Sequence, residues 1–499
     1  MKEEATDSYS HILKYTGIFG GVQGLNILVG LVRNKLVALL LGPAGMGLVS
    51  LFNSTVNFIS QATNFGIPFS AVKHVSELFD SGDENAIKHF VKVVRAWSLL
   101  TALMGMLLCV VVGPLLSNYT FAWGDHTLHF VLLSPAVGLL AITGGETAIL
   151  KGARRLHSLA VIQIYSVLAA FVISIPVYYL YGQTGIVPVI VLMALASMLL
   201  TIRHSYHLYP IHFKGANSLL GEGMEMVKLG IAFVIAGILG SGAEMFIRSY
   251  LNVSSGDLDV VGLYSAGFML TVTYANVVFS AMETDYFPRL SSVCSDTSAL
   301  NQTVNRQIEV SLLIVSPMLA ILIIILPELI PLLFSSKFLP MVSMAQVAVL
   351  ALYIKAISLP ISYIALAKGD SVGYMVLEGI YDIVLVLLVI FGYQHWGLFG
   401  TGVALTVSYL FDILLVGTYV CVRYHYRFSM PVIQYAGIQL SLGLAVYVVT
   451  LINNPFIYWM LGLLLCVASL LVSVNILHQK TSLWASLVEK VKNKFHRNA

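Results

Sequence analysis

Long apolar stretches follow one another along the whole chain, and only short polar turns separate them. A helix needs about 20 apolar residues to cross the hydrocarbon core of a bilayer. With this template, the pattern predicts about fourteen membrane-spanning helices in an all-α polytopic protein. The predicted helices cover residues 12–41, 46–71, 91–116, 127–150, 158–181, 185–203, 226–251, 260–286, 308–334, 342–367, 372–393, 397–422, 430–452 and 455–477.

A second copy of the first half appears when the sequence is shifted by 215 residues. Arg33 then falls on Arg248, and residues 47–50 fall on residues 262–265, with further glycine matches in the same order. The ordered series predicts two pseudo-symmetric six-helix lobes, a plan on which many transporters place the substrate path at the repeat interface. The predicted parts are an N-terminal lobe at 1–205, a C-terminal lobe at 206–425, and two further helices with a basic amphipathic tail at 426–499.

The composition places the chain in a membrane. Hydrophobic residues make up 58% and charged residues 10% of the 499 residues, and the mean hydropathy is +0.87, which is more apolar surface than a soluble core hides. The four cysteines have neither disulfide nor zinc spacing, so we expect no metal and no cofactor. The sequence has no P-loop and no catalytic triad spacing, which argues against an enzyme.

The basic residues set the predicted orientation. Most of the 27 lysines and arginines fall on one side of the membrane when the N-terminus is placed in the cytoplasm, which is the positive-inside pattern. An even number of spans returns the C-terminus to the cytoplasm. A membrane-surface helix is favoured there, with a solvated tail as the alternative, because one helical face carries Trp484, Leu487, Val488, Val491 and Phe495.

Three cations lie within predicted spans: Arg33, Arg248 and Lys355. A charge deep in a bilayer is costly, so such a residue marks a functional position by default. Arg33 shares a helical stripe with Asn26, and the repeat relates Arg33 to Arg248. The two guanidinium groups are therefore predicted to hold an anion from both lobes. The alternatives are snorkelling to the headgroups and, for Arg248, an i,i+4 pair with Glu244.

Amide side chains form a second predicted stripe. The second span places four of them on nearly one face and its repeat mate adds a fifth: Asn53, Asn57, Gln61, Asn64 and Asn276. Amides that face lipid are costly, so we expect them to line a cavity or a helix contact. They would hydrogen-bond sugar hydroxyls in a cavity, and interhelical bonding is the equal alternative.

Four carboxylates in predicted spans are candidates for coupling transport to protons or sodium ions: Asp412, Asp382, Glu146 and Glu244. An ionisable group in a span is functional by default. A structural salt bridge is the alternative for each of them, and Lys355 has Asp412 or Asp382 as its candidate partner.

Four short segments carry a family pattern: residues 41–48 (LGPAGMGL), 286–291 (YFPRLS), 333–338 (LFSSKF) and 367–370 (AKGD). In their order and spacing they resemble the Wzx-type O-antigen and polysaccharide flippases, the polysaccharide transporter branch of the multidrug/oligosaccharidyl-lipid/polysaccharide exporter superfamily. The first segment resembles that family's signature after the first span. The others resemble the end of its eighth span and the turns after its ninth and tenth spans.

The resemblance implies alternating access between two six-helix lobes. The implied substrate is an undecaprenyl-pyrophosphate-linked oligosaccharide, such as an O-antigen unit for lipopolysaccharide, moved from the inner to the outer leaflet of a bacterial cytoplasmic membrane. Arg33, Arg248 and Lys355 are the positions that match the family's basic cavity. The implied partners are the lipid-linked glycan, membrane lipids and polysaccharide polymerase or assembly proteins, with no nucleic acid. Two C-terminal spans extend beyond the family's twelve-span members.

Three other functions compete with a flippase. A multidrug and toxin extrusion exporter has the same fold, and it would favour acidic residues and aromatic walls for cationic drugs. A membrane polymerase or glycosyltransferase needs a large external loop or a carboxylate-rich catalytic loop, and neither is visible. An assembly scaffold fits the spans and leaves the cations within them unexplained.

Overall fold

The structure is a computed structural model, and every element that it describes is a helix. The described residues are 2–121, 124–210, 221, 223–273, 279, 286–287 and 289–480. The α-helices are α1 (Lys2–Thr63), α2 (Ile67–Ser81), α3 (Glu84–Thr120), α4 (Thr127–Gly152), α5 (Leu156–Tyr181), α6 (Ile186–Leu208), α8 (Met224–Ser255), α9 (Leu258–Phe268), α11 (Thr297–Leu333), α12 (Val342–Ala367), α13 (Ser371–Tyr424), α14 (Met430–Val449) and α15 (Pro455–Lys480).

Nine stretches of the described residues are long and apolar enough to cross a membrane. Three of the nine contain a break: at Gly42 in α1, at the 3-10 turn Gly182–Gly185 between α5 and α6, and at Gly397 in α13. Each break falls at the boundary between two helices that the hydrophobic pattern predicts as separate spans. The prediction of an all-helical polytopic membrane protein is confirmed, and the count of fourteen spans stays a prediction.

The chain divides into two compact units. The first contains Met1–Ser265 and Pro331–Phe338, and the second contains Ala266–Ile330 and Leu339–Ala499. These units come from contacts within the folded chain, whereas the predicted lobes come from the sequence repeat. The lobe boundaries therefore stay a prediction.

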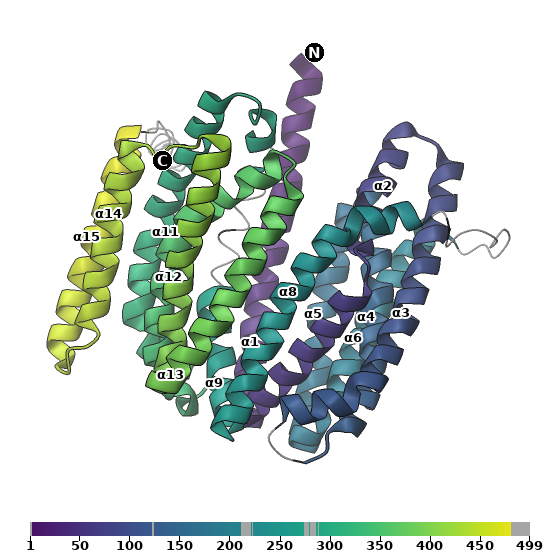
Figure 1. The fold of residues 1–499 in the computed structure, drawn as a ribbon, viewed down its shortest axis with the longest axis horizontal. Helices are drawn as coiled ribbons and strands as arrows, with labels where there is room; N and C mark the ends of the chain where they lie inside the picture. The colour runs from purple at the N-terminus through teal and green to yellow at the C-terminus, as the bar shows by residue number, and fades with distance from the viewer. Residues whose placement is uncertain are drawn as a thin grey trace, which may run out of the picture. The chain divides into compact units, whose positions relative to one another are not determined.

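A glycine turn sets the path of the first unit. Gly66 follows α1 with φ of 72°, a left-handed conformation that glycine adopts without steric cost. A side chain at Gly66 would place its Cβ 2.5 Å from Cα of Gly230 in α8. The two glycines therefore let the turn after α1 touch the backbone of α8. Figure 1 shows α8 running beside the second half of α1, and this pairing forms the wall of the site described below.

The second unit is built around α12, which is largely buried and packs along α13. Buried hydrogen bonds join its last two helices: Gln439 of α14 donates to the Ser473 hydroxyl of α15 (3.0 Å), and the Ser469 hydroxyl donates to Gln439 Oε1 (2.7 Å). The Tyr458 hydroxyl of α15 donates to the carbonyl oxygen of Ile324 in α11 (2.8 Å). Interhelical hydrogen bonds of this kind hold membrane helices together, so α14 and α15 belong to this unit's helix packing.

A tyrosine pair closes the turn between α12 and α13. Asp370 precedes the first residue of α13 and accepts from the backbone N–H of Gly373 (2.8 Å). The hydroxyls of Tyr419 and Tyr424 both donate to Asp370 Oδ2 at 2.5 Å. These hydrogen bonds, that of Tyr419 first, lower the pKa of the Asp370 carboxyl below its ordinary value. The charged aspartate therefore ties the two ends of the bent helix α13 together.

Candidate functional site

A polar cavity of about 590 Å³ lies in the first unit, and we call it the amide cavity. The second half of α1 and the middle of α8 supply most of its wall, with one residue each from α2 and α4. Its lining residues are Ser54, Asn57, Ser60, Gln61, Asn64, Pro68, Leu140, Gly237, Gly240, Ser241 and Glu244. The structure thus brings three of the four amides of the predicted α1 stripe into one cavity.

Helical spacing explains why these residues meet. Residues 57 and 61 are one turn apart and therefore lie on one face of α1, and Asn64 follows the last residue of that helix and lines the same cavity. On α8, Gly237 faces Gln61 with so little room that an added Cβ would lie 3.3 Å from Gln61 Oε1. A larger residue at 237 would therefore fill the space in front of this amide.

One of the amides also has a structural role. Asn64 donates to Gln61 Oε1 (2.6 Å) and accepts from the backbone N–H of Gly66 (2.8 Å), so its side chain stabilises the turn after α1. Asn57 differs, because its side chain is exposed to the cavity. Among the three amides of this cavity, Asn57 is the one best placed to receive a ligand.

A second cavity of about 430 Å³ adjoins the first, and we call it the arginine pocket. Asn57 and Leu140 line both cavities, so the two meet at these side chains. The polar part of the pocket comes from both halves of α1, from α5 and from α6. These residues are Asn26, Arg33, Asn53, Asn57, Gln163, Ser166, Tyr178 and Ser197.

Arg33 is held at the edge of this pocket by helices α5 and α6. Its Nε donates to the Ser174 hydroxyl (3.3 Å), and its Nη2 lies 3.9 Å from Met193 Sδ. The side chain is half-buried. A guanidinium in such a place, beside amides and within an apolar bundle, is suited to the oxygens of a phosphate.

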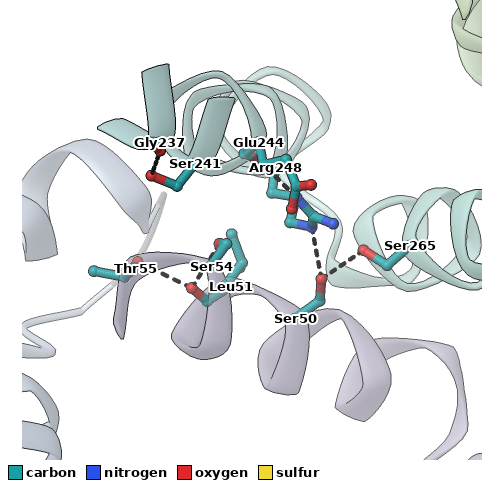
Figure 2. Close-up of polar contacts among 9 residues, drawn as sticks. All are labelled: Ser50, Leu51, Ser54, Thr55, Gly237, Ser241, Glu244, Arg248 and Ser265. Atoms are coloured by element: carbon teal, nitrogen blue, oxygen red, sulfur yellow. Dashed lines mark hydrogen bonds and ion pairs between the residues drawn. The ribbon is translucent and has the colours of Figure 1, made fainter. Parts of the chain in front are cut away.

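Arg248 lies in a different setting, on α8, and is 9% exposed. Its Nε donates to the Ser50 hydroxyl (2.8 Å), and its Nη1 donates to the carbonyl oxygen and to Oε2 of Glu244, both at 3.0 Å. The Ser265 hydroxyl also donates to Ser50 Oγ (2.7 Å). Figure 2 shows this cluster beside the residues of the amide cavity. The carboxylate of Glu244 is 52% exposed and lines that cavity.

Repeat-related residues touch each other in this region. Ser50 and Ser265 are separated by 215 positions, the repeat distance, and are hydrogen-bonded. Gly47 and Gly262 are separated by the same distance, and a Cβ on Gly47 would lie 2.9 Å from the backbone nitrogen of Gly262. In a twofold arrangement, equivalent residues meet only close to the axis. Equivalent residues of the repeat meet in this way where α1 contacts α9.

The two repeat-related arginines have different partners despite this symmetry. Arg248 bonds Ser50 and Glu244, whereas Arg33 bonds Ser174 and contacts Met193. Arg33 lines the arginine pocket, and Arg248 reaches the amide cavity through Glu244. The mirrored clamp on one anion stays a prediction.

Lys355 belongs to the second unit. Its Nζ lies 5.8 Å from the ring centroid of Phe279 and 5.6 Å from that of Tyr409, which are cation–π distances. Lys355 interacts electrostatically with Asp412 and also with Glu378, so the choice between a cavity cation and an ion pair stays open. The hydrophobic pattern did not single out Glu378, which interacts with Asp382 and Asp412. The sequence signal that could have identified Glu378 is its i,i+4 spacing to Asp382, which places both acids on one face of the helix.

Glu146 forms a salt bridge, which was the alternative to an ion-coupling role in the sequence analysis. It is 2% exposed, and Arg95 of α3 donates to it through Nε (2.8 Å) and Nη2 (3.3 Å). The Ser205 hydroxyl of α6 donates to the same carboxylate at 2.5 Å. These bonds join three helices, so the geometry favours a structural role for Glu146.

Some predicted residues lie outside the described part of the chain. They are Asn276 and the C-terminal tail with Trp484, Leu487, Val488, Val491 and Phe495. Among the described residues, no group of three or more His, Cys, Asp or Glu side chains is arranged to hold a metal ion. This includes the carboxylates on α13.

Comparisons with solved structures show the fold. The lipid II flippase MurJ in an inward closed conformation matches with a TM-score of 0.71 and 14% identity, over 93% of this chain and 99% of that chain. An inward-facing MATE family multidrug resistance transporter of the MOP superfamily matches with a TM-score of 0.66 and 14% identity, over 80% and 95% of the two chains. A MOP superfamily transporter from Pyrococcus furiosus matches with a TM-score of 0.57 and 14% identity, over 82% and 94%.

Comparison of the sequence with proteins of curated function finds no match. The profile of a family described as polysaccharide biosynthesis protein matches residues 36–343, which is more than half of the chain. The family profile and the shared fold bear out the prediction of a multi-pass membrane protein related to polysaccharide biosynthesis. The chain belongs to the polysaccharide biosynthesis protein family, and its fold is that of the MOP superfamily transporters.

Proposed function

We propose that the protein is a flippase for a lipid-linked oligosaccharide. The observation that carries the proposal is the junction of two cavities at Asn57: a surface of amides and hydroxyls on one side, and a pocket with a guanidinium on the other. A glycan needs hydrogen-bonding groups, and a diphosphate needs a cation in a low-dielectric setting. A polyprenyl tail needs neither group and remains in the lipid.

In this proposal, Arg33 binds the diphosphate and the α1 amides bind the first sugars. Asn57 contacts both parts of the substrate because it lines both cavities. Asn26 and Asn53 support the phosphate side, since they line the arginine pocket, and Gln61 and Asn64 support the glycan side. Arg248, Lys355 and Asn276 are proposed as further contacts during transport.

The finer identity of the substrate is also part of the proposal. The family's role in polysaccharide biosynthesis and the fold shared with lipid II flippase MurJ support an undecaprenyl-pyrophosphate carrier. An O-antigen or similar unit would then move from the inner to the outer leaflet of a bacterial cytoplasmic membrane, by alternating access of two six-helix lobes. The proposed topology has fourteen spans with both termini in the cytoplasm, and polymerase or assembly proteins are the proposed partners.

Among the ion-coupling candidates, the geometry favours Glu244. Its carboxylate lines the amide cavity and is 52% exposed, while one oxygen accepts from Arg248. A proton or a cation can reach it from the cavity. Asp412 and Asp382 remain proposed coupling residues of the second unit, whereas the buried salt bridge of Glu146 argues against its release of a proton.

A cation-coupled drug exporter is the second candidate. It is favoured by one observation, the exposed carboxylate of Glu244 in the amide cavity, because a cationic drug needs such a partner. The fold shared with a MATE family multidrug transporter is compatible with this function. The guanidinium in the adjoining pocket favours the anionic substrate instead.

Reconstitution into liposomes tests the proposal. The substrate is a fluorescent undecaprenyl-pyrophosphate-linked disaccharide, and its arrival in the outer leaflet is measured by lectin binding. We expect Arg33→Gln to lower the rate about tenfold or more, because a hydrogen bond to a charged group contributes about 1.5–3 kcal/mol. Lys337→Gln is the matched control, since it removes an exposed cation outside both cavities.

Two outcomes would contradict the proposal. One is a wild-type rate for Arg33→Gln at equal protein density. The other is export of a cationic dye that Glu244→Gln abolishes, with no movement of the lipid-linked sugar by the wild-type protein. The second outcome would establish the drug exporter.

A further inference from the structure

A basic pocket of about 500 Å³ lies in the first unit, outside both cavities of the candidate site. The loop between α4 and α5 and the last turns of α6 supply its wall. Its lining residues are Leu150, Arg155, Ser158, Arg203, His204, His207 and Leu208. Two arginines, two histidines and a serine hydroxyl thus surround one space at the ends of three apolar helices, labelled in Figure 1.

The charge of this pocket is not balanced by nearby acids. Within the described residues, neither Arg155 nor Arg203 has a carboxylate within salt-bridge distance. Two acids lie near this end of the unit. The two oxygens of Glu146 already accept from Arg95 and Ser205, and Glu84, which acts on Tyr209 together with Arg155, is paired with Lys88 (2.9 Å). The pocket therefore favours an anion, and arginine presents the forked donors that suit phosphate oxygens.

The walls of the pocket are held in place. The backbone N–H of Arg155 donates to the carbonyl oxygen of Leu150 (2.9 Å), which fixes the loop after α4. On α6, His204 Nδ1 donates to the carbonyl oxygen of Leu200 (3.0 Å). Arg95 donates to the carbonyl oxygen of Tyr209 (2.8 Å), just after the pocket residues. The backbone that carries the basic groups and the ring of His204 are therefore positioned before any ligand arrives, which reduces the entropic cost of binding.

An exposed apolar surface continues from the pocket along both helices. On α5, residues 158, 165 and 172 are spaced by two turns and share one face, where Tyr165 is 54% and Val172 is 66% exposed. On α6, Leu199 lies one turn from Arg203 and is 55% exposed. The basic pocket thus stands at the head of a surface that acyl chains can cover.

We propose that this pocket binds the phosphate of an anionic phospholipid headgroup, with the acyl chains lying along α5 and α6. Basic pockets between membrane helices recognise such headgroups, and the volume fits a glycerophosphate group. A net negative lipid such as phosphatidylglycerol matches the two arginines better than zwitterionic phosphatidylcholine. This inference does not rest on the proposed flippase function.

Lipid binding by the purified full-length protein tests the proposal. Native mass spectrometry measures the binding of phosphatidylglycerol and of phosphatidylcholine to the wild type and to the Arg155→Gln/Arg203→Gln variant. We expect the variant to lose phosphatidylglycerol affinity by about tenfold for each arginine, the low end for a hydrogen bond to a charged group. Phosphatidylcholine carries the same phosphate with a compensating cation, so its weaker binding should fall by less.

The matched control is Lys151→Gln/Arg154→Gln. It removes the same charge at the same end of α4, and its two exposed residues lie outside the pocket. Equal losses in the two variants would overturn the proposal, because they would show a general surface attraction. Wild-type affinity in the pocket variant would overturn it as well. Inorganic phosphate that binds as tightly as the lipid would mark a free-anion site and contradict the headgroup assignment. Circular dichroism of both variants checks that they fold.

Discussion

Glu146 is a candidate for ion coupling, with a structural salt bridge as the alternative. Its buried pair with Arg95 favours the structural role. Arg95 donates to both carboxylate oxygens, and the Ser205 hydroxyl donates to one of them. The side chain of Glu146 is only 3% exposed. The substitution Glu146→Gln keeps the shape of the side chain and removes its charge, so Arg95 is left without a counter-ion.

Removing one partner of a buried ion pair costs about 3–5 kcal/mol, because the other charge stays buried. Arg95 keeps two favourable contacts: Nη1 donates to the carbonyl oxygen of Tyr209 (2.8 Å), and the guanidinium lies 4.2 Å from the ring centroid of Tyr206. Its side chain is also 15% exposed. We therefore expect the low end of the range, a loss of about 3 kcal/mol in the free energy of unfolding. The double variant Arg95→Gln/Glu146→Gln has no unpaired charge, so we expect it to recover most of this loss.

The free energy of unfolding is measured by titrating SDS into mixed micelles, and flipping is measured per folded molecule. A structural role predicts unchanged flipping by the folded double variant. The reasoning is refuted if Glu146→Gln is as stable as the wild type. It is also refuted if a stable double variant no longer transports, because that result would assign ion coupling to Glu146.

Three further predictions follow from single contacts. Asn57→Leu removes the amide shared by both cavities, and we expect flipping to fall about tenfold with stability unchanged, as measured in liposomes and by thermal unfolding. Gly262→Ala would place a Cβ 1.9 Å from the carbonyl oxygen of Pro43, so we expect a loss of about 1–3 kcal/mol in the free energy of unfolding. The control Gly437→Ala adds a Cβ that meets no atom within 4 Å, so its loss should be smaller. Because the pKa of Asp370 is lowered, its charge stabilises the fold at neutral pH, and this contribution is lost as the pH falls through the folded-state pKa. We therefore expect the unfolding temperature of Asp370→Asn to depend less on acid than that of the wild type. The same dependence in both proteins would contradict this.

Helical spacing in the sequence predicted part of the candidate site. Residues 57, 61 and 64 were predicted to share a face because one helical turn separates each from the next, and the structure has them in one cavity. The breaks at Gly42 and Gly397 were also predictable, because the apolar stretches on either side are each long enough to cross a bilayer.

The partners of the charged residues were not predictable in the same way. Arg95 and Glu146 lie on different helices, as do Arg33 and Ser174, and helical periodicity says nothing about which helix a face meets. The hydrogen bond between Ser50 and Ser265 was likewise not visible in the pattern. The repeat distance pairs these residues, but it does not say that they lie close enough to touch.

The bend at Gly42 links the two parts of the proposed substrate site. Asn26 and Asn53 line the same pocket, yet an unbroken helix would place residues 26 and 53 about 40 Å apart. The chain instead reverses at Gly42, whose φ of 67° and ψ of −173° lie outside the helical region, and Figure 1 shows the two halves of α1 running back on each other. Arg33 therefore lines the same pocket as Asn53 and Asn57 only because of this bend. In the proposed flippase, a change in the bend angle at Gly42 would separate the guanidinium of Arg33 from the amides of the second half of α1.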